Sequence, residues 1–320
     1  MDKEWVRNTV EEQINAIYGL KDPSGGDVEK MVAGRFSNNP VLQFPGFREL
    51  NPLFGCYQGT ALLKEHYKGF YDAIEVLGLE KQYIIVDGFG ASAHFAAELK
   101  FKGSGSVYDL ELVALVEPDM EGRVRDLKLY FDTSTFQKAF KTPNARFKDV
   151  RGIMPHPGLD PRSPHHAGAI MADAYNAFGR VYLGTEDWDT WYDLFADDME
   201  VIFKSNVDLL PYAGQYSGKE GFKQWLKKLF SIWSLNSFNF TKTYAEGNIA
   251  DFAMHELHYY DNPDGSRRYL DVYIVQNWIT DGDGKIHLFK SYHDSAWLDE
   301  TFLASKVYKD HYGYPENYAR

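Results

Sequence analysis

The chain has 320 residues, 44% of them hydrophobic, and a formal net charge of −12. A chain of this length more often forms two domains than one. The acidic balance argues against a surface for nucleic acid or for an anionic membrane, because phosphate groups are bound by clustered Lys and Arg. The single cysteine, Cys56, excludes an internal disulfide framework and favours a reducing compartment.

The N-terminal sequence MDKEWVRNTVEEQ lacks the apolar stretch of a signal peptide, and the chain has no run of 18 or more apolar residues. We therefore expect a cytoplasmic protein without membrane contact. Aromatic residues make up 16% of the chain. They predict either a ligand pocket lined with rings or a large aromatic core, and the sequence leaves both interpretations open.

The two halves of the chain repeat one another. FSNNPVLQF from Phe36 matches FADDMEVIF from Phe195, and PLFGCYQG from Pro52 matches PYAGQYSG from Pro211, both at a spacing of 159 residues. Farther on, GRVRDLKLYFDTSTFQKAF from Gly122 aligns with GKIHLFKSYHDSAWLDETF at a spacing of 162. The shared order and spacing predict a tandem duplication, with insertions in loops.

Taken in chain order, each half predicts a helix, a shorter helix, a strand, a turn, a third helix, four strands and a terminal helix. The third helix of each half carries an apolar stripe at helical spacing, formed by Leu63, Tyr67, Phe70 and Ile74 in the first half and by Phe222, Trp225, Leu226, Leu229, Phe230 and Trp233 in the second. The sequence DGDG at 281–284 predicts a hairpin turn. Helices first and strands last indicate the α+β class.

These patterns predict a first domain over 1–145, a linker over 146–163, a second domain over 164–306 and a C-terminal tail over 307–320. Five of the 13 prolines lie between positions 143 and 164, and that segment has no apolar period. Both features are typical of a linker.

The motifs DWDTWYDLFADDMEVIF, PYAGQYSGKEGF and GKIHLFKSYHDSAWL resemble the nuclear transport factor 2-like superfamily, in particular its SnoaL-like polyketide cyclases. The resemblance covers nearly the whole chain, twice. It implies two tandem cone-shaped domains, each a curved and mostly antiparallel sheet wrapped around helices, packed as a pseudo-dimer within one chain. The superfamily includes ketosteroid isomerases, scytalone dehydratase and epoxide-opening cyclases, so the resemblance indicates the fold and leaves the reaction open. The fused pair is expected to be able to form a homodimer.

The last hairpin predicts which side chains face the inside of the second cone. If the turn pairs Thr280 with Lys285, one face carries Val272, Ile274, Gln276, Trp278, His287, Phe289, Ser291 and His293. The matching face of the first half is almost wholly apolar. We therefore expect that face to be the interior, with Trp278, Phe289 and Ser291 contacting a substrate and His293 taking part in proton transfer.

A second histidine is expected from the preceding strand. Aligning ELHYY from Glu256 with ELKF from Glu98 places His255 opposite Ala97. His255 resembles the strand position from which scytalone dehydratase presents an active-site histidine. Two histidines in an apolar cone could divide acid and base duties, so His255 and His293 are the leading catalytic pair; a core or rim role for each stays open.

Other residues are weaker candidates. Asp271 matches Asp109 in the first half; either carboxylate could act as a base, although a shared structural duty is the favoured interpretation. Asp132 and Asp294 are expected to cap the terminal helices. The substrate-binding rings implied by the resemblance are those on or after the first helix of the second domain, namely Tyr175, Tyr182 and Trp188.

The sequence predicts no metal and no cofactor. His255 and His258 lie three apart on a predicted strand and so point to opposite faces, and His165 and His166 are adjacent in the linker region. No nucleotide-binding or serine-hydrolase motif occurs. The leading hypothesis is a cofactor-independent cyclase, isomerase or dehydratase acting on a mostly apolar small molecule. The alternatives are a non-catalytic binding or scaffold protein, and an epoxide-opening enzyme that uses Asp109 and Asp271.

Overall fold

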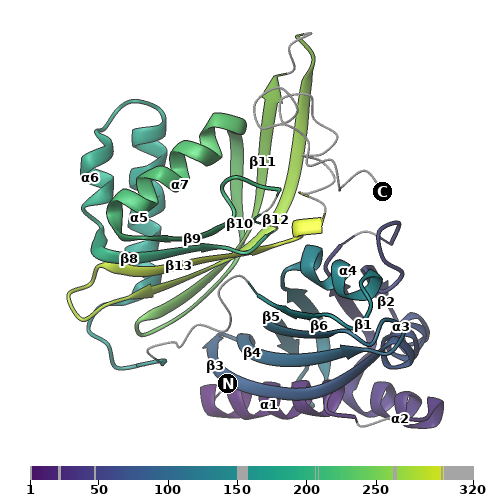
Figure 1. Ribbon diagram of the computed structural model, residues 1–320. Coiled ribbons are helices and arrows are strands. Elements are labelled where there is room, and N and C mark those ends of the chain that lie inside the picture. Colours follow the sequence, from purple (N-terminus) through teal and green to yellow (C-terminus); the bar gives the residue numbers. More distant parts are fainter. Residues whose placement is uncertain are drawn as a thin grey trace. The chain divides into compact units, whose positions relative to one another are not determined.

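The computed structural model consists of two units, Met1–Leu159 and Asp160–Arg320 (Figure 1). The boundary falls inside the predicted linker. Each unit is described by itself below, over residues 2–20, 23–46, 48–149, 158–205, 207, 209–261, 265–296 and 298.

The first unit follows the predicted order of elements. Its helices are α1 (Lys3–Tyr18), α2 (Gly25–Arg35), α3 (Thr60–Ala73) and α4 (Thr133–Lys141), and its strands are β1 (Phe36–Phe44), β2 (Gly55–Gln58), β3 (Ile74–Asp87), β4 (Gly90–Phe101), β5 (Val107–Pro118), β6 (Val124–Tyr130) and β7 (Arg146–Lys148). The sheet order is β2-β1-β6-β5-β4-β3, and β7 pairs with the start of β5. Since β7 lies in the predicted linker, the start of that segment belongs to the first sheet.

The second unit repeats this arrangement. Its helices are α5 (Ala167–Tyr182), α6 (Trp188–Tyr192) and α7 (Gly218–Ile232), and its strands are β8 (Phe195–Phe203), β9 (Gly214–Ser217), β10 (Ser234–Glu246), β11 (Ile249–Asp261), β12 (Arg267–Thr280) and β13 (Ile286–His293). The sheet order is β10-β11-β12-β13-β8-β9, and among these pairs only β13 with β8 is parallel. The predicted α+β class with mostly antiparallel sheets is confirmed for both units. The predicted turn before the third helix contains a short strand in each unit, β2 or β9, and the tail over 307–320 lies outside the described residues.

Bulges bend each sheet at matching places. In β3 the register shifts between Val76 and Gly78 and again between Lys81 and Tyr83; in β10 it shifts at the positions 159 residues later. A bulge bends its strand and increases the local twist. Each sheet therefore curves, and in the second unit α5, α6 and α7 cover one of its faces (Figure 1).

The apolar stripes explain how the third helices pack. In α7, Phe222, Trp225 and Leu226 are buried, and in α3 the buried residues include Leu63, Tyr67 and Phe70. At the end of the first unit, Asp132 caps α4 by accepting hydrogen bonds from the backbone N–H groups of Ser134 and Thr135, as predicted. None of the helices in the described part of the chain has the length and apolar character needed to cross a membrane.

The strand registers show which residues of the two units occupy equivalent positions. Ala97 pairs with Leu110 in the first, and Glu256 pairs with Val272 in the second. The spacing of 159 thus holds through β11, and the three additional residues lie in the hairpin between β11 and β12. The alignment of Glu256 with Glu98 was therefore wrong by one residue, which exchanges the two faces of the strand.

The last hairpin also differs from its predicted register. Trp278 pairs with Phe289 and Ile274 with His293, two residues from the expected pairing, because the chain bulges between the pairs Ile279–Leu288 and Thr280–Ile286. A shift of two residues leaves each side chain on its original face. The predicted inner face of β12 and β13 therefore holds except at His287, which lies in the bulge, is 41% exposed and contacts Asp198.

The turn between β10 and β11 packs closely against the backbone of Asp160. Gly247 has φ +55°, and a Cβ atom at this position would collide with the backbone carbonyl of Asp160. Gly88, the matching residue in the first unit, has φ +62° with open space around it. Both glycines satisfy a positive φ that other residues adopt at a cost.

We predict that Gly247→Ala lowers the free energy of unfolding more than Gly88→Ala does, by about 1 kcal/mol or more, because only Gly247→Ala adds a backbone collision to the strain of a positive φ. Urea unfolding of the two variants measures the difference. Equal losses would contradict the close approach of Asp160 to this turn.

Candidate functional site

The second unit contains a cavity between its helices and the inner face of its sheet. Its volume is about 90 Å³. Half of the residues that line it are Phe, Tyr or Trp, namely Tyr175, Phe178, Trp191, Phe203, Tyr212, Phe222, Trp225, Phe230, Trp233, Phe238, Trp278 and Phe289. The aromatic content of the sequence therefore serves both interpretations, since these rings line a cavity and also form the core.

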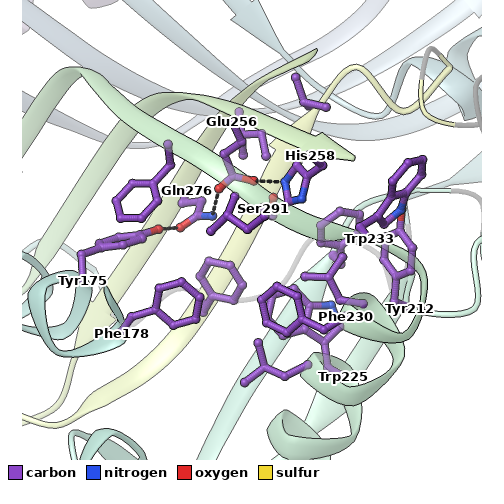
Figure 2. A pocket seen from close by; sticks show the side chains of 18 of the residues that line it. Tyr175, Phe178, Tyr212, Trp225, Phe230, Trp233, Glu256, His258, Gln276 and Ser291 are labelled. Carbon is purple, nitrogen blue, oxygen red and sulfur yellow. Dashed lines mark hydrogen bonds and ion pairs between the residues drawn. The ribbon is translucent and has the colours of Figure 1, made fainter. Parts of the chain in front are cut away.

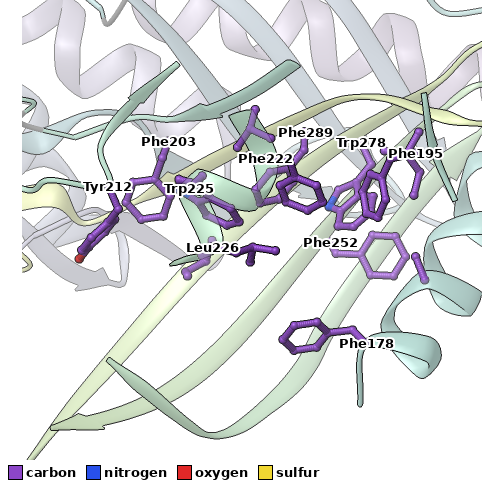
Figure 3. Close-up of a cluster of buried hydrophobic side chains, with 14 of the residues drawn as sticks. Phe178, Phe195, Phe203, Tyr212, Phe222, Trp225, Leu226, Phe252, Trp278 and Phe289 are labelled. Atoms are coloured by element: carbon purple, nitrogen blue, oxygen red, sulfur yellow. The ribbon is translucent and has the colours of Figure 1, made fainter. Parts of the chain in front are cut away.

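Part of this wall is a row of rings along the buried cluster of the second unit (Figure 3). Trp278 lies 5.3 Å from Phe289, Phe289 lies 5.4 Å from Trp225, and Trp225 lies 6.0 Å from Phe203, as measured between ring centroids. These spacings are typical of tilted and edge-to-face contacts. The row gives the cavity a rigid, apolar wall.

Four polar side chains enter the cavity from neighbouring strands. Glu256 and His258 lie on β11, Gln276 lies on β12 and Ser291 lies on β13. Positions two apart on a strand share a face, which brings Glu256 and His258 together. The register places Gln276 directly opposite Ser291.

Glu256 and His258 form a largely buried hydrogen-bonded pair. The distance between Nε2 of His258 and Oε2 of Glu256 is 2.8 Å, and the two side chains are 9% and 14% exposed, respectively. Nδ1 of His258 is buried and has no hydrogen-bond partner within the described part of the chain. A neutral His258 that donates from Nε2 to the carboxylate would keep the lone pair of Nδ1 for a proton.

Gln276 connects this pair to the aromatic wall (Figure 2). Its Oε1 accepts hydrogen bonds from the hydroxyl of Tyr175 and, at 3.3 Å, from Nε1 of Trp278. Its Nε2 donates to Oε1 of Glu256 at 3.5 Å. Burial raises the pKa of Tyr175 well above its ordinary value, and the charge of Glu256 raises it further, so the phenol stays protonated.

The cavity wall carries a carboxylate and no basic side chain other than His258. None of the residues described as lining it is Lys or Arg. An anionic ligand would therefore meet Glu256 without a permanent cation to bind it. The wall suits uncharged or positively charged molecules.

The predicted position of His255 is wrong. Its Nε2 contacts Oδ1 of Asp271, its ring stacks on Tyr273 at 4.8 Å, and its side chain is 28% exposed. Asp271 is 61% exposed, and neither residue lines the cavity. Asp109, the match of Asp271, is likewise outside the first cavity and contacts Arg146 at 2.9 Å. His255 lies on the opposite face because the one-residue slip exchanged inside and outside on β11, and Asp271 on β12 shares that outer face with it.

His293 lies on the predicted face but does not line the cavity. It is fully buried, its ring centroid is 4.3 Å from that of Phe203, and neither ring nitrogen has a partner among the described residues. Burial lowers its pKa to about 3. A histidine that stays neutral and lies behind the wall is a core residue here, which was the alternative kept open for it.

The remaining predicted binding residues divide into two groups. Tyr175, Trp278, Phe289 and Ser291 line the cavity as expected. Tyr182 and Trp188 do not: Tyr182 is 39% exposed and its hydroxyl donates to the backbone carbonyl of Leu235, and Trp188 packs edge-on against Trp191 at 5.6 Å. Both support residues that line the cavity.

The first unit has the same cavity in an apolar form. Its volume is about 30 Å³, and its wall includes Val76, Leu79, Ala97, Leu99, Leu110, Leu112, Leu129 and Phe131. By strand register, Ala97 and Leu99 stand where the second unit has Glu256 and His258, and Ala114 and Leu129 stand where it has Gln276 and Ser291. Each strand-borne polar group of the second cavity is replaced by Ala or Leu.

The sequence contained the signal for the missed pair. Continuing the spacing of 159 from Phe36 and Pro52 into the fourth strand would have placed Glu256 at Ala97 and His258 at Leu99. The Glu-Leu match of ELHYY with ELKF drew the alignment one residue away. No three His, Cys, Asp or Glu side chains lie close enough to share a metal ion in the part of the chain that the structure covers.

No family model and no curated protein matches the chain. Solved structures match it, each over about the length of one unit. A candidate isomerase from Bacillus subtilis has 16% identity and a TM-score of 0.37, covering 45% of this chain and 99% of its own. An NTF2-like protein from Burkholderia xenovorans LB400 has 18% identity and a TM-score of 0.32, covering 41% and 92%.

A third match is an epoxide hydrolase/cyclase-like enzyme of pyran ring formation in the polyether salinomycin, with 17% identity, a TM-score of 0.33 and coverage of 41% and 92%. These likenesses concern the fold. The tandem arrangement of two α+β units rests on the repeated element order and strand order of the chain itself, and membership of the nuclear transport factor 2-like superfamily stays a prediction. How the two units pack together stays a prediction.

We predict that His293→Phe makes stability less dependent on pH. In the unfolded chain a histidine titrates near pH 6.5, whereas burial keeps the pKa of His293 at about 3 in the folded chain. Unfolding therefore takes up a proton between these values, and the contribution of His293 to stability is lost as the pH falls below 6.5. Phe131 fills the equivalent position in the first unit.

Between pH 7 and pH 5 the variant should lose about 2 kcal/mol less unfolding free energy than the parent chain. Urea unfolding at the two pH values measures this difference. His66, which is also buried with its pKa lowered to about 3, is present in both proteins and contributes equally. An unchanged pH dependence would contradict the buried, neutral state of His293.

Proposed function

We propose that the protein is an enzyme that moves a proton within a mostly apolar small molecule in the cavity of its second unit, as a cyclase, isomerase or dehydratase does. The observation that carries the proposal is the Glu256–His258 pair, which is buried in an aromatic cavity and absent from the apolar cavity of the first unit. Acid and base groups held in a dry pocket are suited to proton transfer.

The proposed mechanism uses side chains of this chain. His258 accepts the proton of the substrate, and Glu256 orients the imidazole and stabilises the positive charge that develops on it. Histidine suits this task because its ordinary pKa lies close to cellular pH. The hydroxyl of Ser291, which is buried without a partner among the described residues, is placed to bind an oxygen of the substrate.

The substrate we infer is a ring-bearing molecule without a carboxylate or phosphate group inside the cavity. The rings of the wall offer stacking and edge contacts to a flat ligand. The carboxylate of Glu256 and the lack of Lys and Arg on the described wall disfavour an anion. The proposal places chemistry in the second unit and gives the first a structural or binding role.

The two other hypotheses fare differently. The epoxide-opening mechanism with Asp109 and Asp271 is abandoned, since neither carboxylate lines either of the two cavities found among the described residues. A binding protein without chemistry remains the alternative outcome of the following experiment.

The first test uses 5-nitrobenzisoxazole, whose ring opens when a base removes its C3 proton: the N–O bond breaks and a coloured cyanophenolate forms. We expect the protein to accelerate this reaction, and His258→Gln and Glu256→Gln each to lower the acceleration by about 100-fold or more. Absorbance of the phenolate measures the rate.

His255→Gln is the matched control. It removes a histidine that also contacts a carboxylate but lies outside the cavity, and its rate should equal that of the parent chain. Equal rates in His258→Gln and the parent would contradict the assignment of His258 as the catalytic base. Tight binding of small aromatic molecules with no acceleration would favour the binding protein.

A second test addresses the charge of the ligand. We expect 4-methylphenol to bind at least about tenfold more tightly than benzoate, a difference of about 1.4 kcal/mol, and benzylamine to bind no more weakly than the phenol. Calorimetric titration measures the three affinities. In Glu256→Gln the preference against benzoate should disappear; benzoate binding as tightly as the phenol to the parent chain would contradict this prediction.

A further inference from the structure

Gln276 lies at the centre of the polar network and is not itself an acid or a base. It is 8% exposed and projects from β12 between the aromatic wall and Glu256. We infer that Gln276 is a positioning residue that fixes one oxygen of Glu256, so that the other oxygen is committed to Nε2 of His258. This inference rests on the proposed function of the pair but concerns a property of the free protein.

The first step is the orientation of the amide. An indole N–H is a donor only, so the contact from Nε1 of Trp278 requires an acceptor at 3.3 Å. Tyr175 stays protonated and donates to the same atom. Turning the amide over would place an NH₂ group against the indole N–H of Trp278, which has no lone pair to accept a hydrogen bond. Oε1 of Gln276 must therefore face Tyr175 and Trp278, and Nε2 must face Glu256.

The second step concerns the carboxylate. Nε2 of Gln276 lies 3.5 Å from Oε1 of Glu256, and Nε2 of His258 lies 2.8 Å from Oε2. Each oxygen thus has its own donor. A carboxylate with a donor on each oxygen has less freedom to rotate, and hydrogen bonds to its charged form favour ionisation. The result is a directed chain from Tyr175 through Gln276 and Glu256 to His258.

The third step is the comparison within the chain. In the first unit, Ala114 stands at the position of Gln276 and Val116 at that of Trp278, beside the Ala97 and Leu99 that replace the pair. The amide and the indole are thus absent where the acid and the base are absent. A glutamine kept only for packing would have no reason to change together with them.

The experiment follows the imidazole of His258 by NMR in the full-length, ligand-free protein labelled with ¹⁵N-histidine. The chain has ten histidines, and His258→Gln identifies the resonance by its loss. In the parent chain, neutral His258 should carry its proton on Nε2. In Gln276→Leu the pair should take up its proton at a pH about one unit higher, because the charged carboxylate has lost a donor.

Gln276→Glu should raise the midpoint further, because it sets a second carboxylate against Glu256. Gln215→Leu is the matched control, since Gln215 donates to Glu200 at 2.6 Å on β9, away from the cavity, and it should leave His258 unchanged. If Gln276→Leu does not fold, Tyr175→Phe replaces it: this variant removes one of the two donors that hold the amide and should shift the midpoint in the same direction by a smaller amount.

Unchanged midpoints in the folded Gln276 variants, or in Tyr175→Phe, would overturn the inference, as would a neutral His258 with its proton on Nδ1. Because the readout needs no substrate, it separates the two proposals. A shifted midpoint in a protein that does not open 5-nitrobenzisoxazole would support the role of Gln276 and reject the catalytic function. An unchanged midpoint in a protein that does open it would reject only the role of Gln276.

Discussion

Everything in the second cavity depends on the strict alternation of side chains along β11. Consecutive residues of a strand point to opposite faces, so the register of β11 with β12 decides that Glu256 and His258 face the rings while His255 faces away. The two histidine–carboxylate contacts of this strand region thus lie on different faces. One is buried among aromatic rings and the other is partly exposed, and only the buried pair is protected from the screening that weakens exposed charges.

The curvature of each sheet is the second feature on which the cavities depend. The bulges in β3 and β10 occur at equivalent positions in the two units, so both sheets bend in the same way. Because the two backbones bend alike, the side chains set the volume of each cavity. It is about 90 Å³ in the second unit and about 30 Å³ in the first.

The sequence predicted the fold well because the repeat, the helical stripes and the hairpin signals are local patterns that appear twice. The hairpin pattern predicted Trp278, Phe289 and Ser291 as cavity residues, whereas Tyr175 was implied by the family resemblance alone. The sequence failed for His255 because strand faces depend on an alignment correct to a single residue, and a two-letter match outweighed a spacing that held elsewhere. It could not separate His293 from the cavity, because the depth of that imidazole is set by its packing against Phe203, which no pattern in the sequence records.

The complete difference between the two cavities follows from the energetics of buried polar groups. Glu256, His258 and Gln276 are each supplied with partners by the others. Removing one member of such a network leaves a buried polar group unpaired, at a cost of about 1–3 kcal/mol and more for a charged group, whereas replacing all of them by apolar residues is close to neutral. Intermediate combinations are thus the unstable ones. A duplicated chain can therefore hold the full polar network in one unit and only apolar residues at the matching strand positions of the other. In this chain the apolar residues are Ala97, Leu99, Ala114 and Leu129.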